Sequence, residues 1–247
     1  MTSAQRLRNE EEEEEKEWQM FPIGDDNDNI TGGLPPLVTW ALIAVNVLAF
    51  FMEISRPEAA LQTFIQSWGV VPREYTAGHD LPPLVAAPFW TTLFTSMFLH
   101  GGWMHLGGNM LYLWIFGDNV ERAMGAGKFL VFYLVCGLAA SAAHILFNLW
   151  SSMPAVGASG AISGVLGGYL LLFPRNRVRV ISYGQIVHIP ALVVIGFWIV
   201  LQFVNGIGSV ARTDETAGVA YMAHIGGFVA GIVLVKLFVG RGRVVAR

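Results

Sequence analysis

Residues 157–164 read GASGAISG and open an apolar run that continues to residue 173. Glycine recurs at every fourth position of this run, and the same spacing returns in an apolar run near residue 230. Small residues at this spacing allow two helices in a membrane to approach closely. We therefore expect two tightly packed helices that meet through Gly160, Gly164, Gly168, Gly227 and Gly231.

The rest of the chain is also apolar. Of its 247 residues, 54% are hydrophobic and 13% are charged, and the mean hydropathy is +0.52. Soluble domains carry about 25% charged residues, so the composition indicates a membrane protein. No basic stripe is present, which argues against nucleic acid as a partner. The single cysteine, Cys136, excludes an intramolecular disulfide.

Six apolar runs are candidates for membrane-spanning helices, each of which needs about 20 residues. They lie near 37–52, 104–120, 129–150, 159–173, 189–207 and 218–239. No apolar stretch precedes residue 37, so we expect no cleavable signal peptide. The pattern predicts an all-α polytopic membrane protein, built as a bundle of six transmembrane helices.

The segments outside the six runs divide the chain. Residues 1–33 are polar and acidic and are predicted to form a disordered cytoplasmic tail. Residues 34–240 are predicted to form the six-helix domain, and 241–247 a basic cytoplasmic tail. Residues 54–103, a long first loop rich in proline and tryptophan, are expected to be partly helical and to lie in the membrane interface.

Lysine and arginine predict the orientation of the helices. The N-terminal tail, 121–128, 174–188 and the C-terminal end hold twelve of these residues, and the other side holds three. By the positive-inside rule, both termini are then cytoplasmic and the long first loop faces outward.

Four polar side chains fall at a similar depth in three of the predicted helices. At a rise of about 1.5 Å per residue, Ser159, His224 and His105 lie about 24–25 Å from the charged cytoplasmic helix ends, and Asn109 about 20 Å. Polar residues inside a membrane are functional candidates because they are costly to bury there. We therefore expect these four side chains to form one site.

The chemistry of these four side chains is complementary. Serine becomes an effective nucleophile when a base removes its proton, and histidine is the usual base. His105 and Asn109 share a helix face and can donate hydrogen bonds to an oxyanion. Ser159 also lies near a helix start, where backbone N–H groups are free. No aspartate or glutamate lies within the apolar runs away from their ends, so a Ser-His dyad is indicated, without metal or cofactor.

The motifs around these residues resemble those of the rhomboid family of intramembrane serine proteases. Residues 157–160 match the G-x-S-G nucleophile motif, and 105–109 match H-x-x-x-N on the second helix. Residues 223–231 match A-H-x-x-G-x-x-x-G on the sixth helix. The resemblance covers roughly residues 37–240 and points to the basic six-helix bacterial form.

The resemblance implies a role for each residue. Ser159 would be the nucleophile, His224 the general base, and His105, Asn109 and the Ser159 backbone N–H the oxyanion hole. Supporting roles would fall to His100, Glu121, Gly157 and Gly160. The fifth helix and the 206–218 loop would act as gate and cap. The substrates would be transmembrane proteins, cleaved within the bilayer of a bacterial plasma membrane.

The sequence departs from many relatives at two positions. Thr91 follows Trp90 where many relatives carry an arginine, and Ser163 stands where some place an aromatic residue against the base. What orients His224 is therefore open, as are the physiological substrate and the oligomeric state.

Several alternatives remain beside this interpretation. Ser163 is a rival nucleophile, although helix packing explains it better. His144 and Asn148 are expected to make an interhelical hydrogen bond rather than to act in catalysis. An inactive rhomboid-like binding protein, a proton-conducting transporter and a metalloprotease are the competing functions. The H-E-x-x-H motif of the last is absent.

Overall fold

The structure is a computed structural model and describes residues 21–26, 35–84, 87–182, 184–211 and 220–239. Its long helices are α2 (Leu37–Ile54), α6 (Trp103–Met124), α7 (Ala126–Phe147), α8 (Ser159–Leu172), α9 (Ala191–Ala211) and α10 (Tyr221–Phe238). Between α2 and α6 lie α3 (Glu58–Trp68), α4 (Pro72–Ala77), η2 (Phe89–Thr91), α5 (Thr92–Thr95) and η3 (Ser96–Phe98). The strands are β1 (Phe21–Asp25), β2 (Arg177–Ser182) and β3 (Gln185–Pro190).

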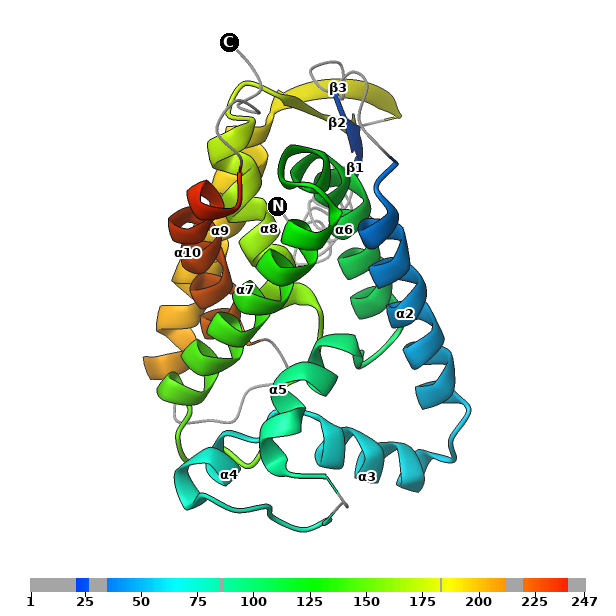
Figure 1. Cartoon of the computed structure of the whole chain (residues 1–247), viewed down its shortest axis with the longest axis vertical. Helices are drawn as coiled ribbons and strands as arrows, with labels where there is room; N and C mark the ends of the chain where they lie inside the picture. The colour runs from blue at the N-terminus through cyan, green and yellow to red at the C-terminus, as the bar shows by residue number, and fades with distance from the viewer. Residues whose placement is uncertain (1–20, 27–34, 85–86, 183, 212–219, 240–247) are drawn as a thin grey trace, which may run out of the picture.

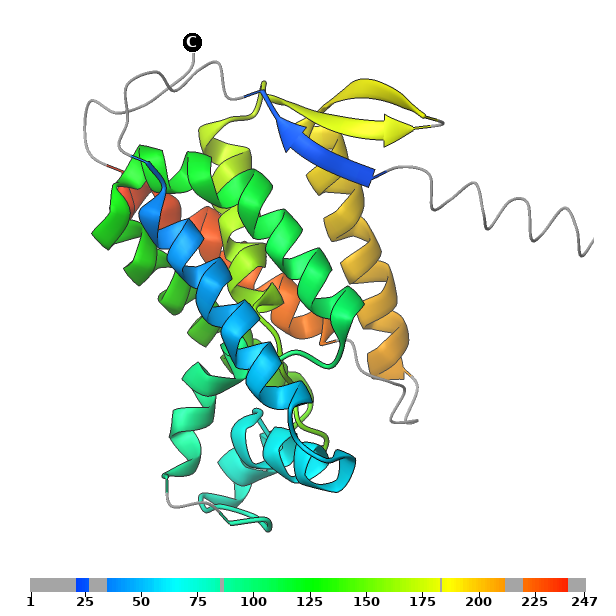
Figure 2. The same ribbon diagram turned by 90° about the vertical axis from the view of Figure 1, so that its right-hand side faces the viewer.

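Helix α8 forms the centre of the bundle. Helices α6, α7, α9 and α10 contact it, and both ribbon views show it between them (Figure 1, Figure 2). All residues from 160 to 169 are buried. Residues 159–164, which begin the glycine repeat, therefore lie at the start of this buried helix.

Glycines set the distance between α8 and α10. A Cβ atom added at Gly227 would stand 2.0 Å from the carbonyl oxygen of Gly160. One added at Gly231 would stand 2.0 Å from the carbonyl oxygen of Gly164. Only glycine allows this approach, which brings the two backbones into direct contact. A Cβ atom added at Gly168 would meet the ring of Phe132 in α7 at 3.1 Å and the side chain of Val235 in α10 at 3.4 Å.

Each of the six apolar runs is helical, with ends that differ by a few residues from those predicted. Three helices, α2, α7 and α10, are long and apolar enough to cross a membrane, judged by length and composition among the described residues. Helix α8 and the apolar part of α9 are shorter. The mainly helical membrane architecture agrees with the prediction, and the number of six crossings stays a prediction.

The prediction of an all-α chain is wrong at one end of the bundle. A three-stranded antiparallel sheet in the order β1-β2-β3 lies there (Figure 2). Within β2, Val178 and Val180 are buried while Arg177 and Arg179 are exposed. This alternation has the period of a strand with one buried face. The arginines identify a charged segment, but the alternating valines determine its structure.

The prediction of a disordered tail is wrong for residues 21–25. Strand β1 pairs with β2, and Asp25 lies opposite Val178. Asp25 is 3% exposed, and its carboxylate accepts hydrogen bonds from the Asn119 amide and the Tyr169 hydroxyl. The folded unit therefore includes residues that the predicted domain boundary excluded. Residues 1–20, 27–33 and 241–247 of the two predicted tails lie outside the described residues.

The segment from 54 to 103 lies at the end of the bundle opposite the sheet (Figure 1). Its described residues, all but 85–86, contain five short helical elements, in agreement with the prediction of a partly helical segment. An isolated bridge joins Val70 to Ala155 through backbone hydrogen bonds of 2.9 and 2.8 Å. The segment thus holds the loop that leads into α8. Its location at a membrane surface stays a prediction.

Candidate active site

Ser159 is the first residue of α8 and follows a turn that requires glycine. Gly157 has a φ of +130°, and a Cβ atom there would stand 2.7 Å from Nε2 of His105. The Gly157 N–H donates to the carbonyl of Ser96 at 2.8 Å. N–H groups in the first turn of a helix lack intrahelical acceptors and attract negative charge. The turn therefore places the Ser159 hydroxyl beside free backbone donors.

His224 comes from the first turn of α10 and reaches this hydroxyl. Its Nε2 atom lies 2.8 Å from Oγ of Ser159. The close approach of α8 and α10 at their glycines makes this distance possible, because side chains of serine and histidine span only a few ångströms. The structure thus brings together the two residues that the sequence paired, and leaves their catalytic roles as predictions.

Helix α9 adds two residues that sequence reasoning missed. The Oε1 atom of Gln202 lies 2.7 Å from Nδ1 of His224. The Trp198 ring lies beside the imidazole, with ring centroids 5.8 Å apart and an interplanar angle of 38°. A glutamine within an apolar helix is itself a signal of function. Nothing in the linear sequence connects it to a histidine on another helix.

His105 and Asn109 lie one turn apart on α6. Asn109 is 8% exposed, and among the described residues no acceptor lies within hydrogen-bonding distance of its Nδ2 atom. The N–H of Gly101 donates to Nδ1 of His105 at 3.4 Å. In a neutral ring this leaves the proton on Nε2. Both side chains therefore have a donor available for another group.

A cavity of about 900 Å³ connects these residues. It is lined by residues of α6, α8, α9 and α10, among them His105, Asn109, Ser159, Trp198 and His224. Pockets for small ligands measure about 300–1,000 Å³, so this cavity has room for a short peptide segment. The four polar residues that were predicted to lie at a similar depth all line this cavity.

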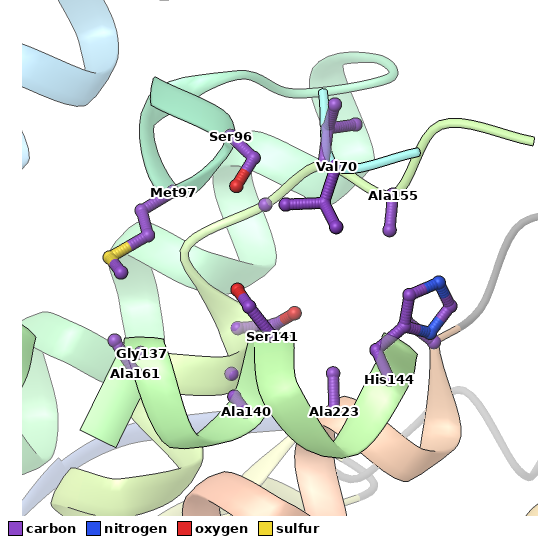
Figure 3. Close-up of a pocket in the computed structure, with 15 residues that line it drawn as sticks. Val70, Ser96, Met97, Gly137, Ala140, Ser141, His144, Ala155, Ala161 and Ala223 are labelled. Carbon is purple, nitrogen blue, oxygen red and sulfur yellow. The ribbon is translucent and has the colours of Figure 1, made fainter. Parts of the chain in front are cut away.

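A second, smaller cavity of about 40 Å³ also borders Ser159. In Figure 3, Ser141 and His144 of α7 lie across from Val70 and Ala155. About 10–15 Å³ suffices to hold a water molecule, provided that polar partners line the site. The cavity therefore has the size and the polarity to hold water next to the serine.

His144 does not make the predicted interhelical hydrogen bond in the described part of the chain. Asn148 donates to the backbone carbonyl of His144 at 2.8 Å and lies 3.4 Å from its Nδ1 atom. The two residues therefore pair at the end of their own helix. Helix α7 ends at Phe147, so Asn148 is free to turn back onto the last turn.

Ser163 is enclosed within α8. Its side chain is fully buried, and its hydroxyl donates to the Ser159 carbonyl at 2.6 Å. This back-bonding is typical of serine in an apolar helix. Gly160, one turn earlier, lies against α7, where a Cβ atom would stand 2.5 Å from that of Ala140.

His100 lies beneath His105 at the entrance to α6. It is 2% exposed, and the two imidazole rings meet edge to face at 5.1 Å. Its backbone N–H donates to the carboxylate of Glu53, at 3.1 Å to the nearer oxygen. The end of α2 thereby fixes the chain just before the helix that carries His105 and Asn109.

Glu121 performs a structural task at the other end of α6. Its carboxylate accepts hydrogen bonds from the Val38 N–H at 3.0 Å, and from the N–H and hydroxyl of Thr39 at 2.7 and 2.8 Å. These groups belong to the first turn of α2, whose preceding residue supplies no side-chain cap. Glu121 therefore caps α2 from a neighbouring helix.

Comparison with known proteins adds to this geometry. A family model described as Rhomboid domain matches residues 87–241. Rhomboid protease GluP of Bacillus subtilis is 31% identical over 198 residues, which cover 79% of this chain and 34% of that protein. Rhomboid protein 1, mitochondrial, of Saccharomyces cerevisiae is 28% identical over 206 residues, with coverages of 80% and 52%. Rhomboid protease AarA of Providencia stuartii is 30% identical over 218 residues, with coverages of 80% and 70%. The chain thus spans about a third of the first of these relatives and half of the second.

Proposed function

The chain belongs to the rhomboid family, and from that premise we propose that it is an intramembrane serine endopeptidase. It hydrolyses peptide bonds in or near the transmembrane segments of other proteins, with Ser159 as nucleophile and His224 as general base. Apolar helices and family membership make it an integral membrane protein. Two relatives, GluP and AarA, carry the name rhomboid protease, which supports the reaction class.

The observation that carries this proposal is the contact between the Ser159 hydroxyl and the His224 imidazole. Nε2 of His224 and Oγ of Ser159 are 2.8 Å apart, within the range of about 2.6–3.2 Å expected of a nucleophile and its base. They lie on a cavity large enough for a peptide segment. A buried polar pair that only stabilised the bundle would not need to face such a cavity.

The reaction follows from this contact. Ser159 Oγ attacks the carbonyl carbon of the scissile bond as its proton passes to Nε2 of His224. The carbonyl π electrons move to the oxygen. The C–N bond then breaks, and the leaving nitrogen takes the proton from His224. Water, deprotonated by the same imidazole, attacks the acyl carbon. The bond from that carbon to Ser159 Oγ then breaks, Oγ takes back the proton from His224, and the second product leaves.

Three donors are available for the oxyanion of this reaction. The Asn109 amide has no acceptor among the described residues, and the hydrogen bond from Gly101 to His105 leaves the Nε2–H of His105 free to donate. The Ser159 backbone N–H is the third. A buried donor without a partner is rare in folded proteins, which supports a role completed only when substrate binds.

The proposed orientation of the bundle across the membrane follows from the residues at its two ends. Arg175, Arg177 and Arg179 are exposed at the sheet end, which suits the cytoplasmic side. Helix α8 runs from Ser159 toward this sheet, so the serine lies nearer the outer face. We propose six crossings, with the sheet on the cytoplasmic side of a bacterial plasma membrane.

Cleavage of a transmembrane substrate by the purified full chain in liposomes tests the proposal. Ser159→Ala and His224→Ala should each lower the cleavage rate by at least about 10⁴-fold, since loss of either partner disables the whole unit. A fluorophosphonate probe should label Ser159 in the unmodified protein and fail to label it in the His224→Ala variant.

Ser163→Ala is the matched control, because this serine lies one turn away and its hydroxyl bonds to the backbone. It should retain cleavage and labelling. Undiminished cleavage by the Ser159→Ala variant would overturn the assignment, as would a probe adduct on any other residue of an active preparation.

A further inference from the structure

Gln202 occupies an unusual position for an amide in an apolar helix. It is 9% exposed, and its oxygen lies 2.7 Å from Nδ1 of His224. The imidazole is thus held between Ser159 at one nitrogen and Gln202 at the other. These contacts come from two different helices, α8 and α9.

A second hydrogen bond determines which way the Gln202 amide points. Its Nε2 atom donates to the backbone carbonyl of Trp198, one turn earlier in α9, at 3.4 Å. A flipped amide would place its oxygen against that carbonyl and its N–H₂ group against His224. The carbonyl of Trp198 therefore favours the orientation in which oxygen, an acceptor only, faces the imidazole.

An acceptor at Nδ1 selects one form of the neutral imidazole. Nδ1 must carry the proton and donate it to Gln202, which leaves the lone pair on Nε2. That lone pair faces the Ser159 hydroxyl, as a general base requires. In the opposite tautomer, the Nδ1 lone pair would face the amide oxygen, and the Nε2–H would oppose deprotonation of the serine.

We propose that Gln202 is the positioning residue of the active site, which fixes the tautomer and rotation of His224 by accepting its Nδ1–H. This inference rests on the proposed protease function. Gln202 supplies the orienting acceptor that aspartate supplies in a triad. It does so without a charge, which suits a site enclosed by apolar helices because an unpaired buried carboxylate is costly.

Replacement of Gln202 by methionine tests the assignment. Methionine has a similar length and no hydrogen-bonding oxygen. We expect kcat for a transmembrane substrate to fall roughly 10–100-fold with KM unchanged, less than the roughly 10⁴-fold loss seen when a triad aspartate is neutralised. The rate of fluorophosphonate labelling at Ser159 should fall by the same factor.

Gln202→Glu separates orientation from packing. The carboxylate keeps an acceptor at Nδ1, so kcat should return to within a few-fold of the wild-type value. It also stabilises the protonated imidazole, which moves the acid limb of the pH–rate profile to higher pH. Among the described residues, His105 and His144 are the other ionisable groups that act electrostatically on His224, and the Gln202→Glu substitution leaves both in place.

Asn205→Leu is the matched control, because Asn205 is an exposed amide on the same helix. It should leave kcat, KM and labelling unchanged. Gln202→Leu replaces the methionine variant if thermal unfolding shows that the latter does not fold. Wild-type kcat in the folded apolar variant, or an unmoved acid limb with low activity in Gln202→Glu, overturns the inference. Absence of Ser159-dependent labelling in the wild-type protein would instead overturn the proposed function itself.

Discussion

Gly157 is the residue whose conformation most directly shapes the site. Its φ of +130° is strained for any residue with a side chain, and a Cβ atom would lie 2.7 Å from the ring of His105. Gly157→Ala should therefore displace His105 from the site and lower kcat by about 10²-fold, the effect of removing one oxyanion donor. Steady-state cleavage of a transmembrane substrate by the Gly157→Ala variant measures this fall in kcat.

Gly78→Ala is the control for backbone strain alone. Gly78 also has a positive φ, of 74°, but open space surrounds it. We expect a loss of stability of about 1–2 kcal/mol with kcat unchanged. Equal effects of both substitutions on kcat would mean that strain, and not the contact with His105, governs the site.

At this scale the sequence identifies residues but not all of their partners. The distance along each helix from its charged end could be counted in residues. That count gave a similar depth for Ser159, His224, His105 and Asn109 and so grouped them. Gln202 and Trp198 could not be assigned to His224, because their contact depends on how α9 is rotated about its axis. The groups that contact the His224 imidazole therefore follow from the packing of α9 against α10.

Among the elements, the contact between α8 and α10 sets the distance between Ser159 and His224. Gly231→Ala would place a methyl group 2.0 Å from the carbonyl oxygen of Gly164, which forces the helices apart. Overpacking of this kind costs about 1–3 kcal/mol. We expect a lower melting temperature together with a reduced kcat, because His224 moves away from Ser159. Thermal unfolding and cleavage assays on the same preparation test both parts.

Gly107→Ala provides the comparison. Gly107 lies in α6, and a Cβ atom there meets nothing within 4 Å. Alanine favours a helix interior by roughly 0.5–1 kcal/mol over glycine, so this variant should be as stable as the wild type or more so. A stable and fully active Gly231→Ala variant would contradict the importance of the glycine contact.

The elements were predictable where hydrophobicity alone defines them. The six long helices follow from apolar runs, and the glycine spacing identified the closest pair. The hairpin of β2 and β3 was missed because its arginines suggested a loop, although Val178 and Val180 alternate with them. Strand β1 has no partner nearby in sequence, so local pattern could not reveal it.

Across the whole molecule, Asp25 fastens β1 to the helices that carry the site. Burial raises the pKa of Asp25 to about 7, against the opposing effect of the hydrogen bond from Tyr169. Undocked, the same carboxyl would titrate near its ordinary value of 3.8. Docking is therefore favoured by protonation: its contribution is complete below about pH 4 and is lost as the pH rises through 7.

Hydrogen exchange in β1 should consequently be slower, relative to intrinsic chemical rates, at pH 6 than at pH 8. Asp25→Asn, which cannot ionise, should remove most of this difference. The neighbouring Asp26 lies 3.8 Å from His188 in a partly exposed pair, so the Asp26→Asn variant should keep the difference in protection between the two pH values. Equal protection of β1 at both pH values in the wild-type protein would argue against Asp25 as the cause.

The same strand has a consequence for biosynthesis. Asp25 and Tyr169, which hydrogen bond in the folded protein, are 144 residues apart in the chain. At about 5–20 residues per second, a ribosome takes roughly 7–30 s to make the second partner after the first. During this interval neither β2 nor Tyr169 has been made, so the backbone of β1 can pair with the edges of other strands. Strand β1 can thus dock only after α8 has left the ribosome, which makes its docking a late step of assembly.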